Sequence, residues 1–377
     1  MRPKFPKTLI ITIILLSFCY LLPSCYSDGY TQAYQLIGTD GSTRYRLNIG
    51  VSQSLYAYYL DKSHKLITSE DFARFVTPYA LNPIADSLRQ IYTDDEDFAN
   101  AVLMITHQIP YQETGPAKYP AETIAENIGD CDLFSYIAAS TMKANGLDTV
   151  LLYYEQEAHM NVGVYIPHAL QDARERAYYV THNGVQYYVA ECTGDNWEEG
   201  WRVGECPPDL KHATAQVITL ESCEQTAPGQ VSASYNTLVT STIALTPSSA
   251  FVIQGTAITF SGQLTPTMQN KQIAIYVKVN NAPWTALGEA TTDMNGRFTF
   301  AWNAEEAGIY YVRASWSGDN DYAVADSPIQ TITVLSTFFV TLIAILIILT
   351  CIGLVVYFAS RQSRQPIPEP EPPAVPY

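Results

Sequence analysis

The sequence predicts an α+β domain, then an all-β sandwich, then one C-terminal transmembrane helix. Three observations lead to this fold class. Residues 26–223 mix helical and alternating apolar patterns, and residues 242–334 alternate with period two throughout. The apolar run 338–358 has no charged residue and has the length of a membrane-spanning helix. A chain of 377 residues is long enough for two domains.

The net charge of −16 argues against a nucleic-acid partner. Binding to phosphates requires clustered lysine and arginine, and the sequence contains no such run. We therefore expect no nucleic acid among the partners.

The first 25 residues have the pattern of a secretory signal peptide or of a short N-terminal anchor. Three basic residues, the last of them Lys7, precede the apolar run from Thr8 to Pro23. The following "LLPSC" resembles a lipidation motif at Cys25, but the proline two residues before the cysteine departs from it. Cleavage, retention and lipidation therefore all stay open.

Two helices are predicted in the first half of the α+β domain. The stretches "SEDFARFV" and "DDEDFANAVLMITHQI" each begin with a capping residue and acidic side chains, followed by apolar residues at helical spacing. Both should pack beside a third helix, which starts near Cys131.

The third helix lies in "AENIGDCDLFSYIAASTMKANG". Asp130 is a suitable N-cap and Asn145-Gly146 a suitable end, which places Cys131 at the first helical position. First-turn N–H groups favour a thiolate over a thiol and can stabilise an oxyanion. The carboxylates of Asp130 and Asp132 act in the opposite direction.

A nucleophilic thiol needs a base, and the base needs an orienting group. The stretch "DTVLLYYEQEAHMNVGVYI" predicts two strands, with His159 at the start of the second. A hairpin with an Asn183-Gly184 turn follows and ends at Glu191. If these strands are antiparallel neighbours, the Glu191 carboxylate can meet the imidazole.

These residues resemble the transglutaminase-like superfamily, a relative of the papain-type cysteine peptidases, in its microbial and archaeal form. The matching words are "IPYQETGPAKYPAETIAENIGDCDLFS", "HMNVGVYI", "YYVAECT" and "GWRVGECP", between residues 106 and 207. The resemblance implies that Cys131 is the nucleophile, His159 the base and acid, and Glu191 the orienting residue. It also implies a transglutaminase-like domain over residues 26–223.

The sequence departs from this family at two positions. Leu133 stands where an aspartate is usual, and Glu191 stands where aspartate is commoner, so Asp195 is an alternative orienting residue. Tyr111 aligns with a tyrosine often seen in the family. It lies near the oxyanion or substrate, or else it is a core tyrosine.

Disulfide bonds are the main alternative role for Cys131. It forms an even set of four with Cys192, Cys206 and Cys223, which allows two bridges in an oxidising compartment. If Cys131 is the nucleophile, Cys192 and Cys206 are the favoured pair, because they flank an apparent loop. The histidines show no metal-binding spacing, so we expect neither a metal nor a cofactor.

Residues 224–241 have the composition of a linker, and residues 242–334 predict about seven short strands. The segment "TTDMNGRFTFAWNAEEAGIYYVRASWSGDNDYAVADSP" resembles microbial surface immunoglobulin-like domains. Its acidic loop, residues 319–326, lacks the ligand spacing of a calcium loop and predicts an exposed turn. We expect this domain to be a spacer.

The basic residues Arg361 and Arg364 directly follow the apolar run 338–358. By the positive-inside rule, the proline-rich acidic tail 359–377 is cytoplasmic and both folded domains are extracytoplasmic. The protein is then a single-pass protein of the cell membrane.

The expected function is thiol acyl-enzyme chemistry on amide or peptide bonds, with proteins or peptides of the cell envelope as substrates. Hydrolysis by a peptidase or amidase is favoured, because microbial members of the similar family span these activities more than cross-linking. Two alternatives stay open: a cross-linking transglutaminase, and an inactive envelope protein with a binding or structural role.

Overall fold

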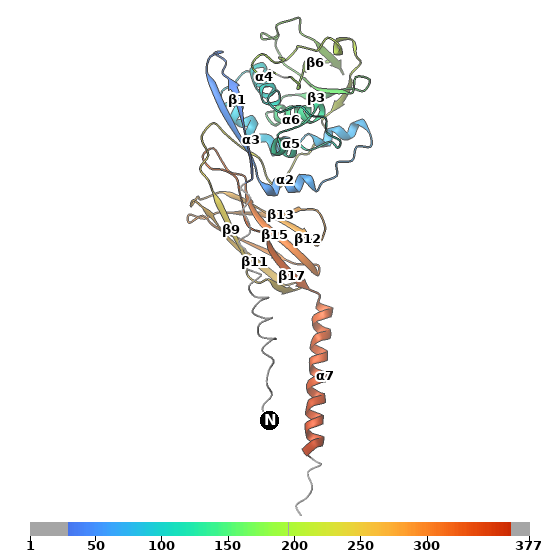
Figure 1. The fold of residues 1–377 in the computed structure, drawn as a ribbon, viewed down its shortest axis with the longest axis vertical. Coiled ribbons are helices and arrows are strands. Elements are labelled where there is room, and N and C mark those ends of the chain that lie inside the picture. The colour runs from blue at the N-terminus through green and yellow to red at the C-terminus, as the bar shows by residue number, and fades with distance from the viewer. Residues whose placement is uncertain (1–28, 195, 363–377) are drawn as a thin grey trace, which may run out of the picture.

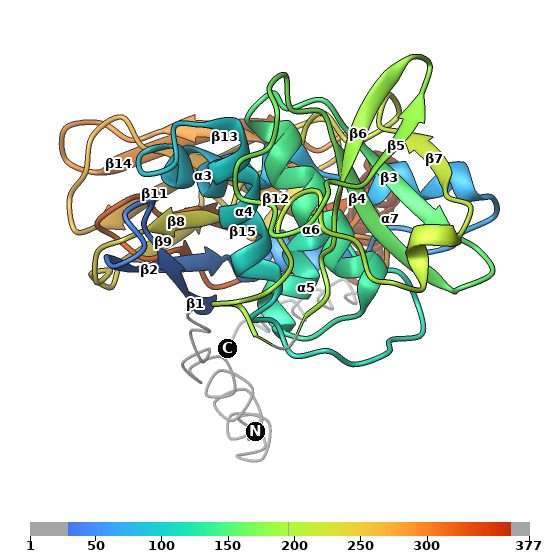
Figure 2. The same cartoon turned by 90° about the horizontal axis from the view of Figure 1, so that it is seen from above.

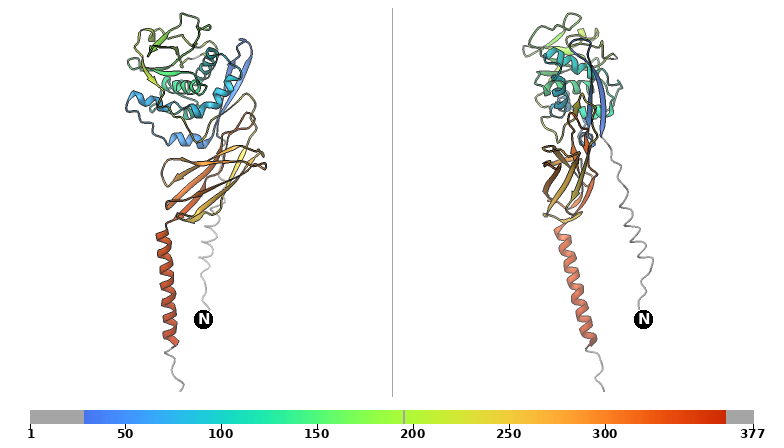
Figure 3. Two further views of the ribbon diagram at one scale, coloured as in Figure 1. Left: turned by 180° about the vertical axis from the view of Figure 1, so that it is seen from behind. Right: turned by 90° about the vertical axis from the view of Figure 1, so that its left-hand side faces the viewer.

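A computed structural model describes residues 29–194 and 196–362. The predictions for residues 1–25, for Asp195 and for the tail beyond residue 362 lie outside these ranges. Figure 1 shows three parts along the long axis: a mixed α/β domain, a β-sandwich and a C-terminal helix. The α/β domain and the helix lie at opposite ends of the sandwich in both views of Figure 3.

The first domain is built on an antiparallel sheet in the order β5-β6-β4-β3-β7. Its strands are β3 (Thr149–Tyr154), β4 (His159–Val164), β5 (Tyr179–His182), β6 (Val185–Ala190) and β7 (Gln216–Thr219). The predicted turn joins β5 to β6, and both Asn183 and Gly184 have positive φ, as a two-residue hairpin of this kind requires.

Helices cover one face of this sheet. Helix α6 (Cys131–Ala144) packs directly on β3 and β4, and the other helices are α2 (Gln53–Leu60), α3 (Pro78–Arg89), α4 (Asp95–Thr106), α5 (Pro120–Glu126) and a 3₁₀ helix at Ser69–Phe75. A second 3₁₀ helix, Leu210–His212, belongs to the opposite face. The stretch "SEDFARFV" thus forms a 3₁₀ helix rather than an α-helix. Helix α6 is central and lies between α4 and strand β4 (Figure 2).

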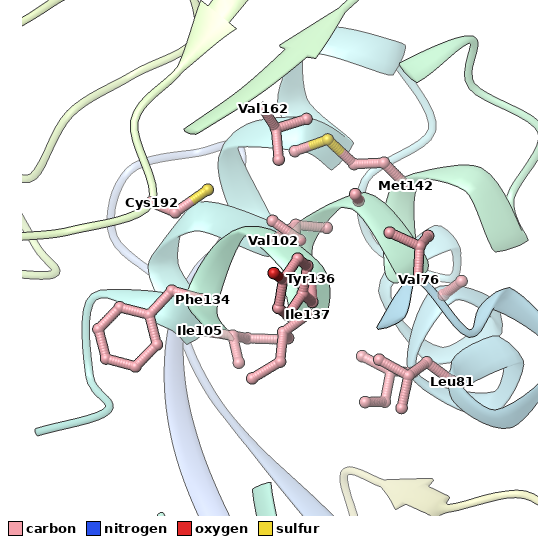
Figure 4. Packing of buried hydrophobic residues seen from close by; sticks show 14 of the residues in the cluster. Val76, Leu81, Val102, Ile105, Phe134, Tyr136, Ile137, Met142, Val162 and Cys192 are labelled. Atoms are coloured by element: carbon pink, nitrogen blue, oxygen red, sulfur yellow. The ribbon is translucent and has the colours of Figure 1, made fainter. Parts of the chain in front are cut away.

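Apolar side chains from these elements form the main core around α6. Figure 4 shows Tyr136 and Ile137 of α6 against Val102 of α4 and Val162 of β4, all of them buried. The opposite face of the sheet carries a smaller apolar cluster, which includes Cys206. The position of α6 is therefore fixed from several sides, and with it the position of its first residue.

The predicted linker is a part of the first domain. Strand β8 (Ser232–Ser234) is buried and pairs with β2 (Arg44–Val51), which in turn pairs with β1 (Tyr30–Ile37). The segment 224–241 was expected to be a linker because it is rich in small and polar residues. Small side chains also let a strand lie close to its neighbours, and Gly50 directly faces Ser232.

The second domain is a sandwich of two sheets with one apolar core between them. One sheet has the order β10-β17-β15-β12-β13, with β16 beside β15, and the other has the order β14-β11-β9. The strands are β9 (Thr242–Pro247), β10 (Phe251–Ile253), β11 (Ala257–Thr265), β12 (Gln272–Val279), β13 (Thr285–Thr291), β14 (Arg297–Asn303), β15 (Gly308–Trp316), β16 (Ala325–Asp326) and β17 (Gln330–Leu335).

The two domains are joined through specific polar contacts. The Asp326 carboxylate accepts hydrogen bonds from the backbone N–H of Gln53 and of Ser54 and from the Ser54 hydroxyl. Arg313 donates to the Gln53 carbonyl oxygen at 2.9 Å. The acidic loop 319–326 was expected to be an exposed turn, but Asp326 at its end caps the first turn of α2.

The helix α7 (Thr337–Gln362) follows β17 after a single residue. Its segment Thr337–Ser360 is long and apolar enough to cross a membrane.

Candidate active site

Cys131 is the first residue of α6, as the sequence predicts. Its side chain is partly exposed and free. The Ser135 hydroxyl lies 2.7 Å from the Cys131 carbonyl oxygen and 3.0 Å from the Met160 carbonyl oxygen. Ser135 therefore ties the first turn of α6 to β4, the strand that begins with His159.

His159 lies next to the thiol because of the turn before β4. The carbonyl oxygen of Ala158, a residue with φ of 48°, lies 3.9 Å from Cys131 Sγ. The imidazole Nε2 lies 2.9 Å from Glu191 Oε2, and Cys131 lies close enough to the imidazole to raise the pKa of His159. The three residues predicted from the sequence thus form one contiguous chain of contacts in the order Cys131, His159, Glu191.

Glu191 is held by several donors in a fully buried position. The Thr193 backbone N–H and hydroxyl donate to Oε1 at 2.9 and 2.7 Å, and Asn161 donates to Oε2 at 3.3 Å. Burial acts to raise the pKa of Glu191, but the hydrogen bond and charge of His159, together with Thr193, lower it below its usual value. The carboxylate is therefore charged and fixed in orientation.

The pKa of His159 responds to opposing effects. Burial acts to lower it, whereas hydrogen bonds with Cys131 and Glu191 and the negative charges of both raise it to about 10. An imidazolium held between a carboxylate and a thiolate is the arrangement of an activated cysteine nucleophile.

Of the two aspartates beside Cys131, Asp132 has a raised pKa. Burial, followed by the hydrogen bond and charge of Asp130, raises the pKa of Asp132 to about 8. Asp130 does not cap the helix with its side chain; its Oδ2 accepts from the Thr114 backbone N–H at 2.7 Å. Its Oδ1 is buried without a hydrogen-bond partner among the described residues, close to the Asp132 carboxyl. The nucleophile therefore has fewer negative charges beside it than the sequence suggests.

Tyr111 lies at the rim of the site and not in the core. Its side chain is 55% exposed, and its ring packs edge-on against Phe134 of α6. Partial burial, followed by the proximity of Cys131, raises the pKa of its hydroxyl. The segment is held by backbone pairing of Tyr111 with Gly129. Of the two roles predicted for Tyr111, this position fits the one near the substrate.

The predicted Cys192–Cys206 disulfide does not form. Both thiols are free and buried, as is that of Cys223. Cys192 packs in the core on the helical face of the sheet, and Cys206 packs in the cluster on the opposite face. Separation along the chain gave no information about which face each side chain occupies.

Sequence reasoning missed three residues that support the site. Thr193 and Asn161 hold the Glu191 carboxylate, and His107 Nε2 lies 2.9 Å from the Glu191 carbonyl oxygen. Thr193 lies two residues after Glu191, a spacing at which a hydroxyl can bond locally, so it could have been found. His107 directly follows α4 and bonds to a backbone carbonyl, which leaves no sequence signal.

A comparison with protein families finds one match, over residues 243–335, to the bacterial Ig-like domain (group 3) family. These residues are an Ig-like domain. The prediction of an immunoglobulin-like surface domain at 242–334 is thereby confirmed, whereas no transglutaminase-like family model matches. No curated protein matches the sequence.

Solved structures similar to this chain include the β-glucosidase EmGH1 from Erythrobacter marinus, with 14% identity and a TM-score of 0.20. That match covers 25% of this chain and 15% of the enzyme's chain. A chain from a structure of T cell activation by the bacterial superantigen toxic shock syndrome toxin-1 has 14% identity and a TM-score of 0.19, covering 25% of this chain and 99% of that one. Neither likeness bears on the function of this chain.

Proposed function

We propose that this protein is a membrane-anchored cysteine enzyme of the transglutaminase-like type, which hydrolyses amide or peptide bonds of envelope proteins or peptides. The observation that carries the proposal is the contact chain from Cys131 through His159 to the buried Glu191. Burying a carboxylate costs free energy. A buried Glu191 with four donors, next to an imidazole and a partly exposed thiol, is therefore the arrangement expected of a catalytic site.

The reaction follows from the positions of these groups. The Cys131 thiolate attacks the substrate carbonyl carbon, and the new C–S bond pushes the carbonyl electrons onto oxygen. N–H groups at the start of α6 stabilise this oxyanion. The C–N bond then breaks, and the His159 imidazolium gives its proton to the leaving amine or ammonia. A thioester on Cys131 remains.

Water completes the cycle. The neutral imidazole takes a proton from water, whose oxygen attacks the thioester, and the C–S bond breaks to release a carboxylic acid. Throughout, Glu191 holds the ring by Nε2, so the other ring nitrogen faces the reacting atoms. If an amine attacks in place of water, the product is a cross-link.

The anchoring supports envelope substrates. With α7 across the membrane and Arg361 and Arg364 on the cytoplasmic side, the site projects outside the cell, beyond the Ig-like domain. The substrates of this site are then molecules that lie close to the outer surface of the membrane.

The proposal is tested with purified full-length protein and a library of synthetic peptides that contain glutamine and asparagine, with and without added amine. Mass spectrometry distinguishes three products: cleaved peptides, deamidated peptides and amine adducts. We expect cleavage or deamidation that Cys131→Ser abolishes. Adducts formed in preference to hydrolysis would favour the cross-linking alternative, and unchanged peptides across a broad library would favour an inactive protein.

A further inference from the structure

Four apolar side chains lie at the end of the Ig-like domain next to α7, on the outer face of its larger sheet. Phe251 is 70% exposed, and Ile253 and Ile309 are 42% and 43% exposed. Leu335 is partly exposed. Between them, Val252 and Val334 point the other way, into the core. We call Phe251, Ile253, Ile309 and Leu335 the membrane-proximal patch.

The strand register places the four side chains on one face of the sheet. Phe251 and Ile309 both pair with Thr333, one from each side of β17, so this threonine lies between them, and Ile253 pairs with Leu335. Paired residues on adjacent strands have Cα atoms about 5 Å apart. The four side chains therefore share one surface. Exposed apolar residues are ordinarily scattered singly, and these are not.

The patch is also at a defined height above α7. Leu335 comes two residues before Thr337, where the helix begins. At about 3.3 Å per residue, Leu335 and Ile253 lie roughly 7 Å above the helix start, and Phe251 and Ile309 roughly 13 Å above it. The apolar run 338–358 spans about 30 Å as a helix, which is the thickness of the hydrocarbon core. The headgroup layer is about 5–8 Å thick on each side, so Leu335 and Ile253 lie at its outer edge in an upright domain. A tilt of the domain toward the patch brings Phe251 and Ile309 down to the same layer.

We infer that the membrane-proximal patch seats the Ig-like domain on the bilayer that α7 spans. The inference goes beyond the proposed catalysis and rests on α7 crossing the membrane. Aromatic and aliphatic side chains partition into the headgroup region, and α7 holds these side chains beside it. Contact at the patch, in addition to the helix, fixes the tilt of the ectodomain and hence the height of Cys131 above the membrane.

Two acidic side chains near the patch indicate which lipid headgroup charge it favours. Glu305 and Glu306 are exposed in the β14–β15 loop, which Gln254 contacts through the Glu305 carbonyl oxygen at 2.7 Å. Gln254 also donates through its backbone N–H to the Leu335 carbonyl oxygen at 2.9 Å, so the acids lie beside the patch. Carboxylates are repelled by anionic headgroups, and the patch should therefore seat on zwitterionic lipid more firmly than on anionic lipid.

The experiment uses full-length protein in nanodiscs of phosphatidylcholine with brominated acyl chains, which quench nearby tryptophan fluorescence. Phe251→Trp reports on the patch, and Leu346→Trp reports on the middle of α7. Ile67→Trp is the matched control, because Ile67 is 75% exposed on the first domain. The measured signal is the fluorescence of the introduced tryptophan above that of the parent protein. We expect it to decrease about twofold or more for Phe251→Trp, because a ring in the headgroup region lies close to the brominated chains, and not to change for Ile67→Trp.

Three results would overturn the inference. If Leu346→Trp is quenched but Phe251→Trp is not, the patch lies in water. If neither is quenched, α7 does not span the bilayer, and the inference that the patch contacts the bilayer is wrong. If energy transfer between differently labelled copies shows that Phe251 contacts a second molecule, the patch is a protein interface. The fluorescence readout requires no catalysis, so it is independent of the proposed function.

Discussion

At the scale of single residues, Glu191 controls the charge of His159. Replacing Glu191 with glutamine removes the negative charge and keeps the shape, so the pKa of His159 should fall well below its present value of about 10. Alkylation of Cys131 should become slower, because a neutral imidazole stabilises the thiolate less. Histidine NMR titration measures the first effect, and alkylation kinetics the second.

The matched control for this change is Glu122→Gln. Glu122 is also buried and contacts an imidazole, that of His64, with an Nε2–Oε2 distance of 2.9 Å. This variant should leave the titration of His159 and the labelling of Cys131 unchanged. Equal effects of the two substitutions would mean that general destabilisation, and not the catalytic contact, explains the result.

Asp132 should make stability depend on pH. Its pKa is about 8 in the folded protein and near its usual low value in the unfolded chain, so the folded state binds the extra proton between these values. The free energy of unfolding is highest at acidic pH, decreases as the pH rises toward 8, and levels off above. Thermal melting across pH 6 to 9 tests this slope.

Asp132→Asn should remove that contribution. The amide has no proton to lose and can still donate to Asp130, so the variant should gain stability over the parent most strongly above pH 8. A parent and variant with parallel pH profiles would show that Asp132 is ionised at neutral pH.

The residues of the candidate site were predictable because local patterns placed them. Asp130 at the N-cap position and the Asn145-Gly146 stop located α6, although the Asp130 side chain does not cap it, and an Asn-Gly turn located β6. The supporting contact of His107 was not predictable, because it joins α4 to a backbone carbonyl 84 residues away. The disulfide prediction was wrong, because cysteine spacing does not reveal which face of the sheet each side chain occupies.

At the scale of elements, Gly129 fits the turn into α6 closely. A Cβ atom there would lie 2.9 Å from the Phe134 ring and 3.2 Å from Leu133 Cβ. Gly129→Ala should therefore shift the start of α6, cost about 1–3 kcal/mol of stability and slow the labelling of Cys131. Thermal melting and alkylation kinetics measure the two effects.

Gly115→Ala is the control for the turn. It lies in the preceding connection, between α4 and α5, where a Cβ would meet nothing within 4 Å. The control should be close to neutral in both measurements. If Gly129→Ala is as well tolerated as Gly115→Ala, the geometry of this turn does not set the position of the nucleophile.

Elements defined by local signals were predicted better than those defined by distant pairing. Helices α4 and α6 and the β5–β6 hairpin follow their caps and turns. Strand β8 is three residues of small side chains, and it exists because β2 supplies hydrogen bonds from 184 residues earlier in the chain. A composition typical of linkers cannot indicate such a partner.

At the scale of the whole molecule, Asp326 links the two domains through hydrogen bonds with Gln53 and Ser54. Asp326→Asn weakens its hydrogen bonds with Gln53 and Ser54, because a neutral amide oxygen is a poorer acceptor than a carboxylate. The distribution of distances between spin labels on the two domains should broaden. Glu305→Gln, at the opposite end of the sandwich, should leave it unchanged; a narrow distribution in both variants would show that other contacts suffice.

The central claim is that Cys131 is an activated nucleophile, and its reactivity tests that most directly. Full-length protein, unreduced, is treated briefly with iodoacetamide and analysed by mass spectrometry, alongside Cys131→Ser and His159→Ala. We predict selective labelling of Cys131, ahead of the buried Cys192, Cys206 and Cys223, and its loss in both variants. Labelling of Cys131 that is slow and indifferent to His159, or Cys131 found in a disulfide, would contradict the account.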